Sequence, residues 1–177
     1  QELGERYEAY HAGGVDKSKD NPLAINNDAR LIALDPRLID PAAPPGNKLA
    51  AVADRIIAIW EKTRDNRYNY SAEDHRPHPV PGALIGVFLN NGTPGGKNRG
   101  GFDAYQELKT LLIERGMPAD KIAFIQDAER ADQRRKLVHQ ANHGGINVLM
   151  GSTIRMGKGL NAQNRMVALF HVDPDWR

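Results

Sequence analysis

The segment Gly151–Asn161 contains the residues whose types and spacing are best suited to chemistry. It reads Gly-Ser-Thr-Ile-Arg-Met-Gly-Lys-Gly-Leu-Asn, and a glycine-rich turn that follows a strand can aim backbone amides at an anion. A nucleotide-binding P-loop requires four residues between its glycines and a Ser or Thr after its lysine. Here five residues separate Gly151 from Gly157, and Gly159 follows Lys158. The segment therefore fails the spacing of a P-loop.

The same segment suits a contact with a sugar–phosphate backbone. Its hydroxyl, amide and cationic side chains can donate hydrogen bonds to phosphate oxygens, and its glycines allow a close approach of the two backbones. The residues predicted to contact nucleic acid are Ser152, Thr153, Arg155, Gly157, Lys158 and Asn161. A glycine-rich turn with incidental charge is the alternative interpretation.

A second glycine-rich segment, Asn90–Gly101, contains five glycines, two cations and no acidic residue. This composition favours a flexible linker, with ordering on nucleic acid as the second possibility. His139 and His143 have the i, i+4 spacing of zinc ligands on a helix, but Gln140 stands where a metalloprotease needs Glu. They are interpreted as surface or packing residues, so no metal site is predicted, and no spacing indicates a self-contained hydrolytic site.

Hydrophobic periodicity predicts the elements that must position these segments. Alternating strands and helices in the second half indicate an α/β fold with a mostly parallel sheet and helices on both faces. Residues 65–82 are expected to be an exposed loop. The expected helices cover residues 2–12, 26–34, 48–64, 102–113 and 129–141, and the expected strands cover residues 83–89, 121–125, 147–151 and 166–172.

Ligands of parallel sheets gather beyond the carboxyl ends of the strands. The segments to expect there follow the four predicted strands, namely residues 90–101, 126–127, 152–161 and 173–177. Charge supports a polyanion partner for the last third of the chain, because eight basic and four acidic residues lie from Glu129 onward while the net charge of the whole chain is +2.

Length and composition narrow the class of protein. A chain of 177 residues makes about one ordinary domain. It has no cysteine, which excludes disulfides, thiol nucleophiles and cysteine-ligated metals. No apolar run reaches the roughly 18–20 residues that a membrane span needs, and no secretory signal is evident. We therefore expect a cytoplasmic protein with no membrane partner, and the absence of an initial Met suggests a piece of a longer chain.

The stretch Val148–Arg177 resembles the second RecA-like lobe of superfamily-two helicases, nearest to the Snf-type and the phage or plasmid helicase–methylase proteins. Val148–Thr153, Gly157–Asn161 and Val167–Asp173 are similar to motif V and the strand that follows it. Upstream, Leu84–Leu89 is similar to the motif IV strand, and Ile122–Asp127 with Gln133 and Arg134 matches the strand and helix before motif V. The order agrees throughout. Leu31–Leu38 and the helix from Lys48 resemble the entry segment of the second lobe in Snf-type proteins, so the resemblance covers nearly the whole chain.

This resemblance implies a three-layer RecA-like domain at residues 48–177, preceded at residues 1–47 by a helical lead-in with a Pro-rich link. It implies that Ser152, Thr153 and the Gly157–Asn161 turn touch nucleic acid, expected to be DNA, and that Gly157, Gly159 and Asn161 contact ATP. The ATP would be shared with a first RecA-like lobe, which would also supply the Mg²⁺. That lobe and the arginine-finger helix expected after Arg177 are missing from the sequence, so the fragment alone is expected to be inactive.

A rival from another class is a Rossmann-like small-molecule enzyme that binds a cofactor phosphate at Gly157–Asn161. That enzyme needs a glycine-rich fingerprint after its first strand and an acidic residue about 20 positions later. In this chain the glycine-rich turn follows the third predicted strand of the sheet, and the sequence stops 16 residues after Asn161. A pure interaction module with Pro-rich docking loops is a third possibility.

Overall fold

A four-stranded parallel sheet forms the centre of the protein. The computed structural model describes residues 2–13, 21–71, 73–95, 101–157 and 161–174. The strands are β1 (Leu84–Phe88), β2 (Ile122–Phe124), β3 (Val148–Gly151) and β4 (Met166–His171), and their order in the sheet is β2-β3-β1-β4. All three neighbouring pairs are parallel, as in Ile85↔Val148 between β1 and β3.

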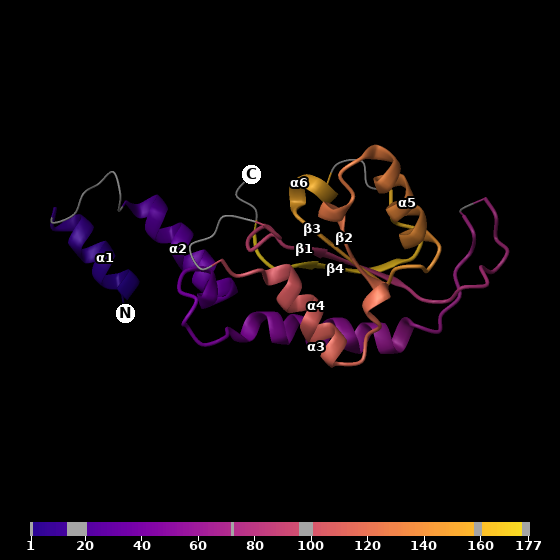
Figure 1. Cartoon of the computed structure of the whole chain (residues 1–177), viewed down its shortest axis with the longest axis horizontal. Helices are drawn as coiled ribbons and strands as arrows, with labels where there is room; N and C mark the ends of the chain where they lie inside the picture. The colour runs from indigo at the N-terminus through magenta and orange to yellow at the C-terminus, as the bar shows by residue number, and fades with distance from the viewer. Residues whose placement is uncertain (1, 14–20, 72, 96–100, 158–160, 175–177) are drawn as a thin grey trace.

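Helices cover both faces of this sheet (Figure 1). The helices α3 (Asn47–Thr63) and α4 (Ala104–Glu114) lie on one face, and α5 (Ala131–Asn142) and the one-turn α6 (Thr153–Met156) lie on the other. Connections between parallel strands are right-handed, so connections that run in opposite directions along the sheet place their helices on opposite faces. The connection from β1 to β2 runs one way along the sheet, and the connections from β2 to β3 and from β3 to β4 run back. The predicted α/β class is thus confirmed, and the arrangement is consistent with a three-layer RecA-like fold.

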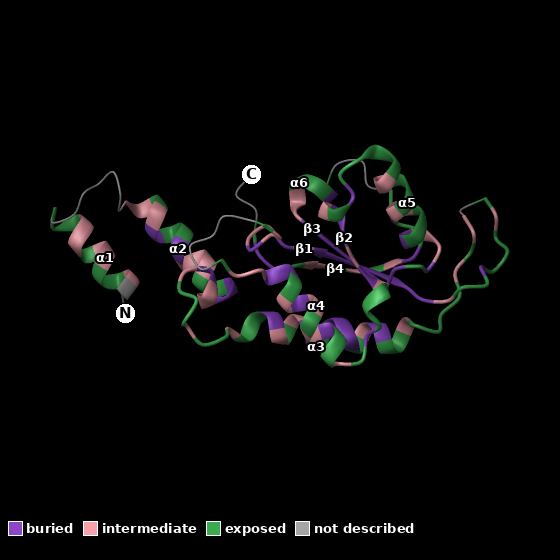
Figure 2. Ribbon diagram, viewed as in Figure 1, coloured by how far each residue is buried: buried purple, intermediate pink, exposed green. Residues whose placement is uncertain are grey.

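Burial along the strands explains why the two layers of helices form (Figure 2). The central strand β1 is buried on both faces, with Ile85 and Val87 in the core under α3 and α4 and Leu84 in the smaller core under α5. The edge strand β4 alternates instead, and its outward residues Val167 and Leu169 are exposed. Among the described residues, the one-turn α6 is the only helix between β3 and β4, and these two side chains remain exposed.

The amino-terminal segment comprises α1 (Glu2–His11), α2 (Pro22–Leu34) and the 3-10 helix η1 (Pro36–Leu38). Helix α2 begins four residues before the predicted start at residue 26, because Asn21 caps it by accepting a hydrogen bond from the Ala24 amide at 3.0 Å. Leu34 and Leu38 are buried in the same core cluster as Ile85 and Val87. The core therefore continues across residue 47, and the division into 1–47 and 48–177 stays a prediction.

A buried carboxylate ties this segment to the rest of the molecule. Asp35 is fully buried and accepts hydrogen bonds from the Arg37 guanidinium at 2.9 Å and the Gly46 amide at 3.2 Å. Burial alone would raise the pKa of Asp35, but the hydrogen bonds from Arg37 and Gly46 outweigh it and hold the pKa below its usual value. Arg37 also donates to Glu107 of α4 at 2.8 Å, so the network crosses from η1 to the helix layer.

Several predicted boundaries shift by one to two residues, and the 65–82 segment differs more. The second predicted strand is shorter than expected because two 3-10 helices, η2 (Ala119–Lys121) and η3 (Ile125–Asp127), flank β2. The expectation that residues 65–82 are simply an exposed loop is wrong for His78 and Gly82, which are buried. The segment folds back on itself through an antiparallel bridge between Asn69 and Pro77.

Candidate functional site at the carboxyl ends of the strands

The segments after β1 and β4 are clamped together by Asp173. This carboxylate is buried, with 4% of the residue exposed. It accepts hydrogen bonds from the Asn90 amide at 2.7 Å, from the Asn91 amide at 2.9 Å and from Asn91 Nδ2 at 2.6 Å. In return, Asn90 Nδ2 donates to the Asp173 carbonyl oxygen at 3.2 Å. Two loops from neighbouring strands thereby form one fixed surface.

The same Asn90 positions the segment after β3. Its Oδ1 accepts a hydrogen bond from the Thr153 amide at 2.9 Å, at the start of α6. Because this amide already has a partner inside the protein, it is not free to bind a phosphate oxygen. Of the predicted contact residues at the start of α6, Ser152 and Thr153 are half-buried and Arg155 is exposed.

A cavity of about 500 Å³ opens between these segments. Ser152 and Arg155 lie on one side of it, and Asp127 and Glu129, which follow β2, lie on another. The two carboxylates repel a phosphate, while the neutral donors and acceptors around them suit hydroxyl groups. The full lining consists of Asn90, Thr93, Pro94, Gln126, Asp127, Glu129, Ser152, Ile154 and Arg155.

Below the cavity, a buried tyrosine connects α4 to the ends of β1 and β2. The Tyr105 hydroxyl donates to the Leu89 carbonyl oxygen and accepts a hydrogen bond from Gln126 Nε2 at 2.8 Å. Burial raises the pKa of Tyr105 well above its usual range, so the hydroxyl stays protonated. The buried Gln126 Oε1 has no hydrogen-bond partner in the described part of the chain. The hydrogen bond to Tyr105 fixes the side chain of Gln126, which also lines the cavity.

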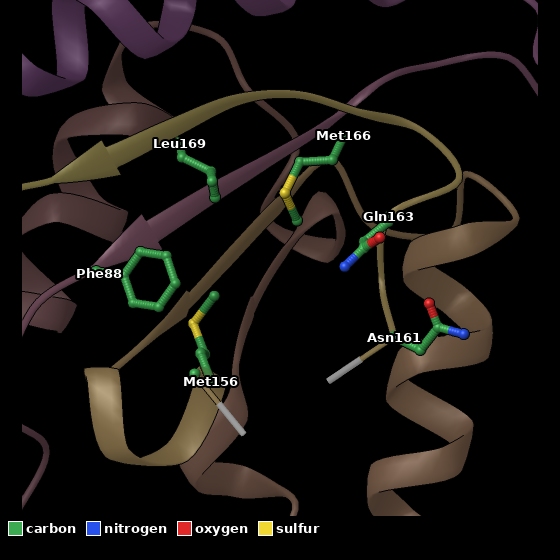
Figure 3. A pocket seen from close by; sticks show the side chains of 7 residues that line it. Phe88, Met156, Asn161, Gln163, Met166 and Leu169 are labelled. Atoms are coloured by element: carbon green, nitrogen blue, oxygen red, sulfur yellow. The ribbon is translucent and has the colours of Figure 1, made fainter. Parts of the chain in front are cut away.

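A second hollow lies on the sheet face beside α6, not at its edge. It has a volume of about 460 Å³, and Gly157 and Asn161 contribute to its lining. Figure 3 shows apolar side chains from β1, α6 and β4 around it, with Gln163 pointing toward it and Asn161 beside α5. The lining consists of Phe88, Met156, Gly157, Asn161, Gln163, Met166 and Leu169.

The structure thus divides the residues that the sequence placed in one site. Ser152 and Arg155 share the carboxyl-edge cavity, and Thr153 starts α6 beside them, whereas Gly157 and Asn161 line the groove on the sheet face. The predicted residues Lys158 and Gly159 lie outside the described residues.

The predicted flexible linker at Asn90–Gly101 is partly corrected. Residues 96–100 lie outside the described residues. Asn90 and Asn91 contradict the prediction, because hydrogen bonds to Asp173 hold both, and the Gly92 carbonyl oxygen accepts from the Ala104 amide at 2.9 Å. The beginning of the segment is therefore a built part of the site.

Sequence reasoning identified the segments after the strands but not the two residues that organise them. Asn90 and Asp173 are 83 positions apart, and the only signal in the sequence was that each directly follows a predicted strand. His78 differs from the predicted exposed loop, since its buried ring packs against His143, whereas the ring contacts of His139 and His143 agree with the packing role predicted for them. Within the described ranges, no group of three or more His, Cys, Asp or Glu residues is arranged to hold a metal ion.

Comparisons with known proteins give no family for this chain. No protein-family model, no curated protein and no solved structure matches it. Among the residues that the structure describes, no helix has both the length and the apolar character needed to cross a membrane. Function must therefore be argued from the residues and geometry of the site.

Proposed function

We propose that this chain is the C-terminal lobe of a DNA-dependent ATPase or helicase, which contributes DNA-backbone contacts and half of an ATP cleft between two lobes. The observation that carries the proposal is the position of Ser152–Gly157. This segment leaves the carboxyl end of β3, and Asn90 at the end of β1 holds its first amide. Ligands of parallel sheets bind at such an edge.

The charges at this edge suggest how a nucleic acid strand would lie. Arg155 is exposed and can pair with a phosphate from outside the cavity. Asp127 and Glu129 disfavour a phosphate inside it. A sugar can enter, since an internal deoxyribose carries no charge that the carboxylates would repel, and its ring oxygen can accept a hydrogen bond from Ser152. We therefore place phosphates on the outer side of α6 and a sugar toward the cavity.

The described residues expected to contact ATP provide no charged group, unlike those expected to contact nucleic acid, which include Arg155. Gly157 and Asn161 line the groove on the sheet face, and neither carries a charge. They could approach a nucleotide through backbone and amide groups, but the phosphate charge and the Mg²⁺ would have to be held by the other lobe. This chain alone is therefore expected to leave ATP unhydrolysed, because phosphoryl transfer needs a phosphate cradle, metal ligands and stabilising cations together.

The order of the strands argues against the Rossmann-like alternative. In the classic dinucleotide-binding order, strands 1 and 2 are neighbours and the glycine-rich turn follows strand 1. Here β3 lies between β1 and β2, and the glycine-rich turn follows β3. No observation on the described residues favours a cofactor phosphate at Gly157–Asn161.

The proposal is tested by the affinity of the protein for fluorescent DNA across a salt series. Binding should be weak and indifferent to sequence, and it should weaken with salt by a slope of roughly −0.7 to −0.9 per phosphate neutralised. Arg155→Ala or Lys158→Ala should weaken every sequence alike and reduce the slope by about one unit for each phosphate that is no longer neutralised. Thr153→Val and Asn161→Ala should leave the slope nearly unchanged, since each removes a neutral hydrogen bond worth about 0.5–1.5 kcal/mol.

Lys48→Ala provides a matched control. Lys48 is exposed at the start of α3, on the opposite face of the sheet, and its substitution removes the same charge. If Lys48→Ala weakens binding as much as Arg155→Ala does, the attraction depends on net charge and the carboxyl edge is not the contact. Phosphate release above about 0.1 per second from the isolated chain would refute the half-cleft, since enzymes of this kind typically turn over at or above about 1 per second.

A further inference from the structure

A row of aromatic rings joins the 65–82 segment to the end of α5. The ring centroids of His139 and His143 are 4.2 Å apart, those of His143 and His78 are 5.0 Å apart, and those of His78 and Tyr70 are 4.5 Å apart. His139 lies in α5 and His143 caps it. His78 and Tyr70 come from the segment before β1. The row is therefore a contact between a loop and a helix that lie far apart in the sequence.

The His78 ring of this row is held by hydrogen bonds inside the folded-back segment. His78 is 8% exposed, and its Nδ1 accepts a hydrogen bond from the Val80 amide at 3.1 Å. An accepting nitrogen carries no proton, so this imidazole is neutral. The His78 amide donates to the Tyr68 carbonyl oxygen at 2.8 Å, which fixes the ring within the folded-back segment.

Beneath the row, the same segment covers an arginine. Arg165 is 1% exposed, and its Nη1 donates to the Val80 carbonyl oxygen at 2.8 Å and to the Gly82 carbonyl oxygen at 3.3 Å. The Tyr68 ring lies 5.6 Å from the guanidinium carbon. In the described part of the chain, Nε and Nη2 of Arg165 have no hydrogen-bond partner. Burying a cation with so few hydrogen-bond partners costs free energy, and this cost opposes the closed position of the segment over Arg165.

The charged groups around His143 do not favour a second positive charge. From the segment before β1 it faces His78 and, beyond it, Tyr70, whose ring carries the Arg76 guanidinium at 5.7 Å. On α5, the His139 ring lies next to it, and the positive charge of Arg165, just before β4, helps to lower the pKa of His143. Other charged groups nearby are Lys121, which donates to the Gly144 carbonyl oxygen at 3.1 Å, and Asp74, which is paired with Arg76 at 2.7 Å.

We propose that this histidine row is a pH-sensitive clasp, which holds the 65–82 segment against α5 at neutral pH and releases it when His143 is protonated. A proton on His143 adds a second positive charge near the buried Arg165 guanidinium, under a segment that shields both groups from water. Moving the segment away admits water to both charges and so removes the cost of burying them together. Acidification therefore uncovers a cationic surface at the amino ends of the strands, opposite the proposed DNA contact.

The sign and size of the effect follow from proton linkage. Burial, followed by the charges of His139, His78 and Arg165, lowers the pKa of His143 in the closed form. In the released form the pKa returns toward its ordinary value of about 6.5. Between these two values the released form binds more protons. Each unit fall in pH therefore raises the ratio of released to closed molecules by up to about tenfold.

Amide hydrogen exchange measured by NMR tests the clasp in the whole chain. The amides of His78 and Gly82 report on the segment, because they donate to the carbonyl oxygens of Tyr68 and Asn66. After correction for intrinsic exchange, their protection should fall by up to about fivefold between pH 6.5 and pH 5.5, because the released form is already about half protonated at pH 6.5. His143→Phe keeps an aromatic ring without the titrating group and should remove the pH dependence. His75→Gln changes an exposed histidine of the same segment outside the row and should retain it.

Three results would overturn the clasp: protection that does not change with pH in the parent protein, a response that persists in His143→Phe, or a response that disappears in His75→Gln. If His143→Phe fails to fold, the titration of the His143 ring in the parent protein decides. A measured pKa below 6.5 together with pH-dependent protection supports the clasp, whereas a value at or above 6.5 refutes it.

Discussion

Asp173→Asn is the most direct test of how the candidate site is built. The carboxylate receives three hydrogen bonds, one on Oδ1 from the Asn90 amide and two on Oδ2 from the Asn91 amide and Asn91 Nδ2. An asparagine in the same place has one oxygen and one NH₂ group. Whichever way it is turned, at least one donor faces the NH₂ group and loses its acceptor.

The expected cost follows from this count. A buried donor left without an acceptor costs about 1–3 kcal/mol. A hydrogen bond to a charged group contributes about 1.5–3 kcal/mol, and part of this contribution is lost when the carboxylate becomes a neutral amide. We therefore expect the free energy of unfolding to fall by about 2–4 kcal/mol, which lowers Tm by about 5–15 °C in a chain of this size. Urea denaturation at pH 7 measures the change. DNA binding should weaken in parallel, because Asn90 also positions Thr153.

Asp120→Asn is the matched control, because Asp120 is exposed and surface substitutions usually change stability by less than about 0.5 kcal/mol. A loss of stability in Asp173→Asn no larger than that in Asp120→Asn would refute the clamp. Loss of stability with unchanged DNA affinity would instead separate the clamp from the proposed contact.

Four further predictions concern buried groups of the fold and the site. Acid should lower the free energy of unfolding as the pH falls below about 4 and through the depressed pKa of Asp35, because a carboxyl with a depressed pKa stabilises the fold fully only above its unfolded pKa of about 3.9. Arg37→Met should lower the free energy of unfolding by about 3–5 kcal/mol at pH 7 in urea denaturation, because it leaves the buried Asp35 without its ion-pair partner. Gly151→Ala should cost about 1–3 kcal/mol in the same assay, because its Cβ would lie within 2.6 Å of three side-chain atoms, whereas Gly4→Ala, in open space, should not be destabilising. Tyr105→Phe should cost about 1–3 kcal/mol by leaving two polar partners unpaired, and a melting curve that matches the parent would contradict the hydrogen bonds described.

The strands and the larger helices could be predicted because their signals are local. The run Leu84–Phe88 is apolar and is followed by Asn90-Asn91-Gly92, and α3 has one continuous apolar stripe. Periodicity over three or more turns is a strong signal. Helix α6 has only four residues, too few for any period. Its start depends on the Asn90 side chain, 63 positions away, which no local pattern records.

The order of the strands and the grouping of the site residues depend on contacts between distant segments. The alternation of strands and helices predicts a parallel sheet, but it does not tell that β3 lies between β1 and β2. Likewise, Ser152 and Asn161 belong to one glycine-rich stretch, yet Met156 between them is buried against the sheet. Because that side chain holds α6 down, the stretch reaches two different surfaces rather than one.

The anchors at both ends of this stretch bear on how a ligand would be bound. Asn90 accepts from the Thr153 amide at its start, and Asn142 of α5 holds its other end, donating to the Asn161 carbonyl oxygen at 2.7 Å and accepting from the Asn164 amide at 3.2 Å. Ordering a loop on binding consumes part of the interaction free energy. A turn whose two ends are already fixed loses less of it. Under the proposed function, the weak contacts of this edge would therefore still bind a strand, and Asn90 and Asn142, which fix the two ends, would set how much affinity remains.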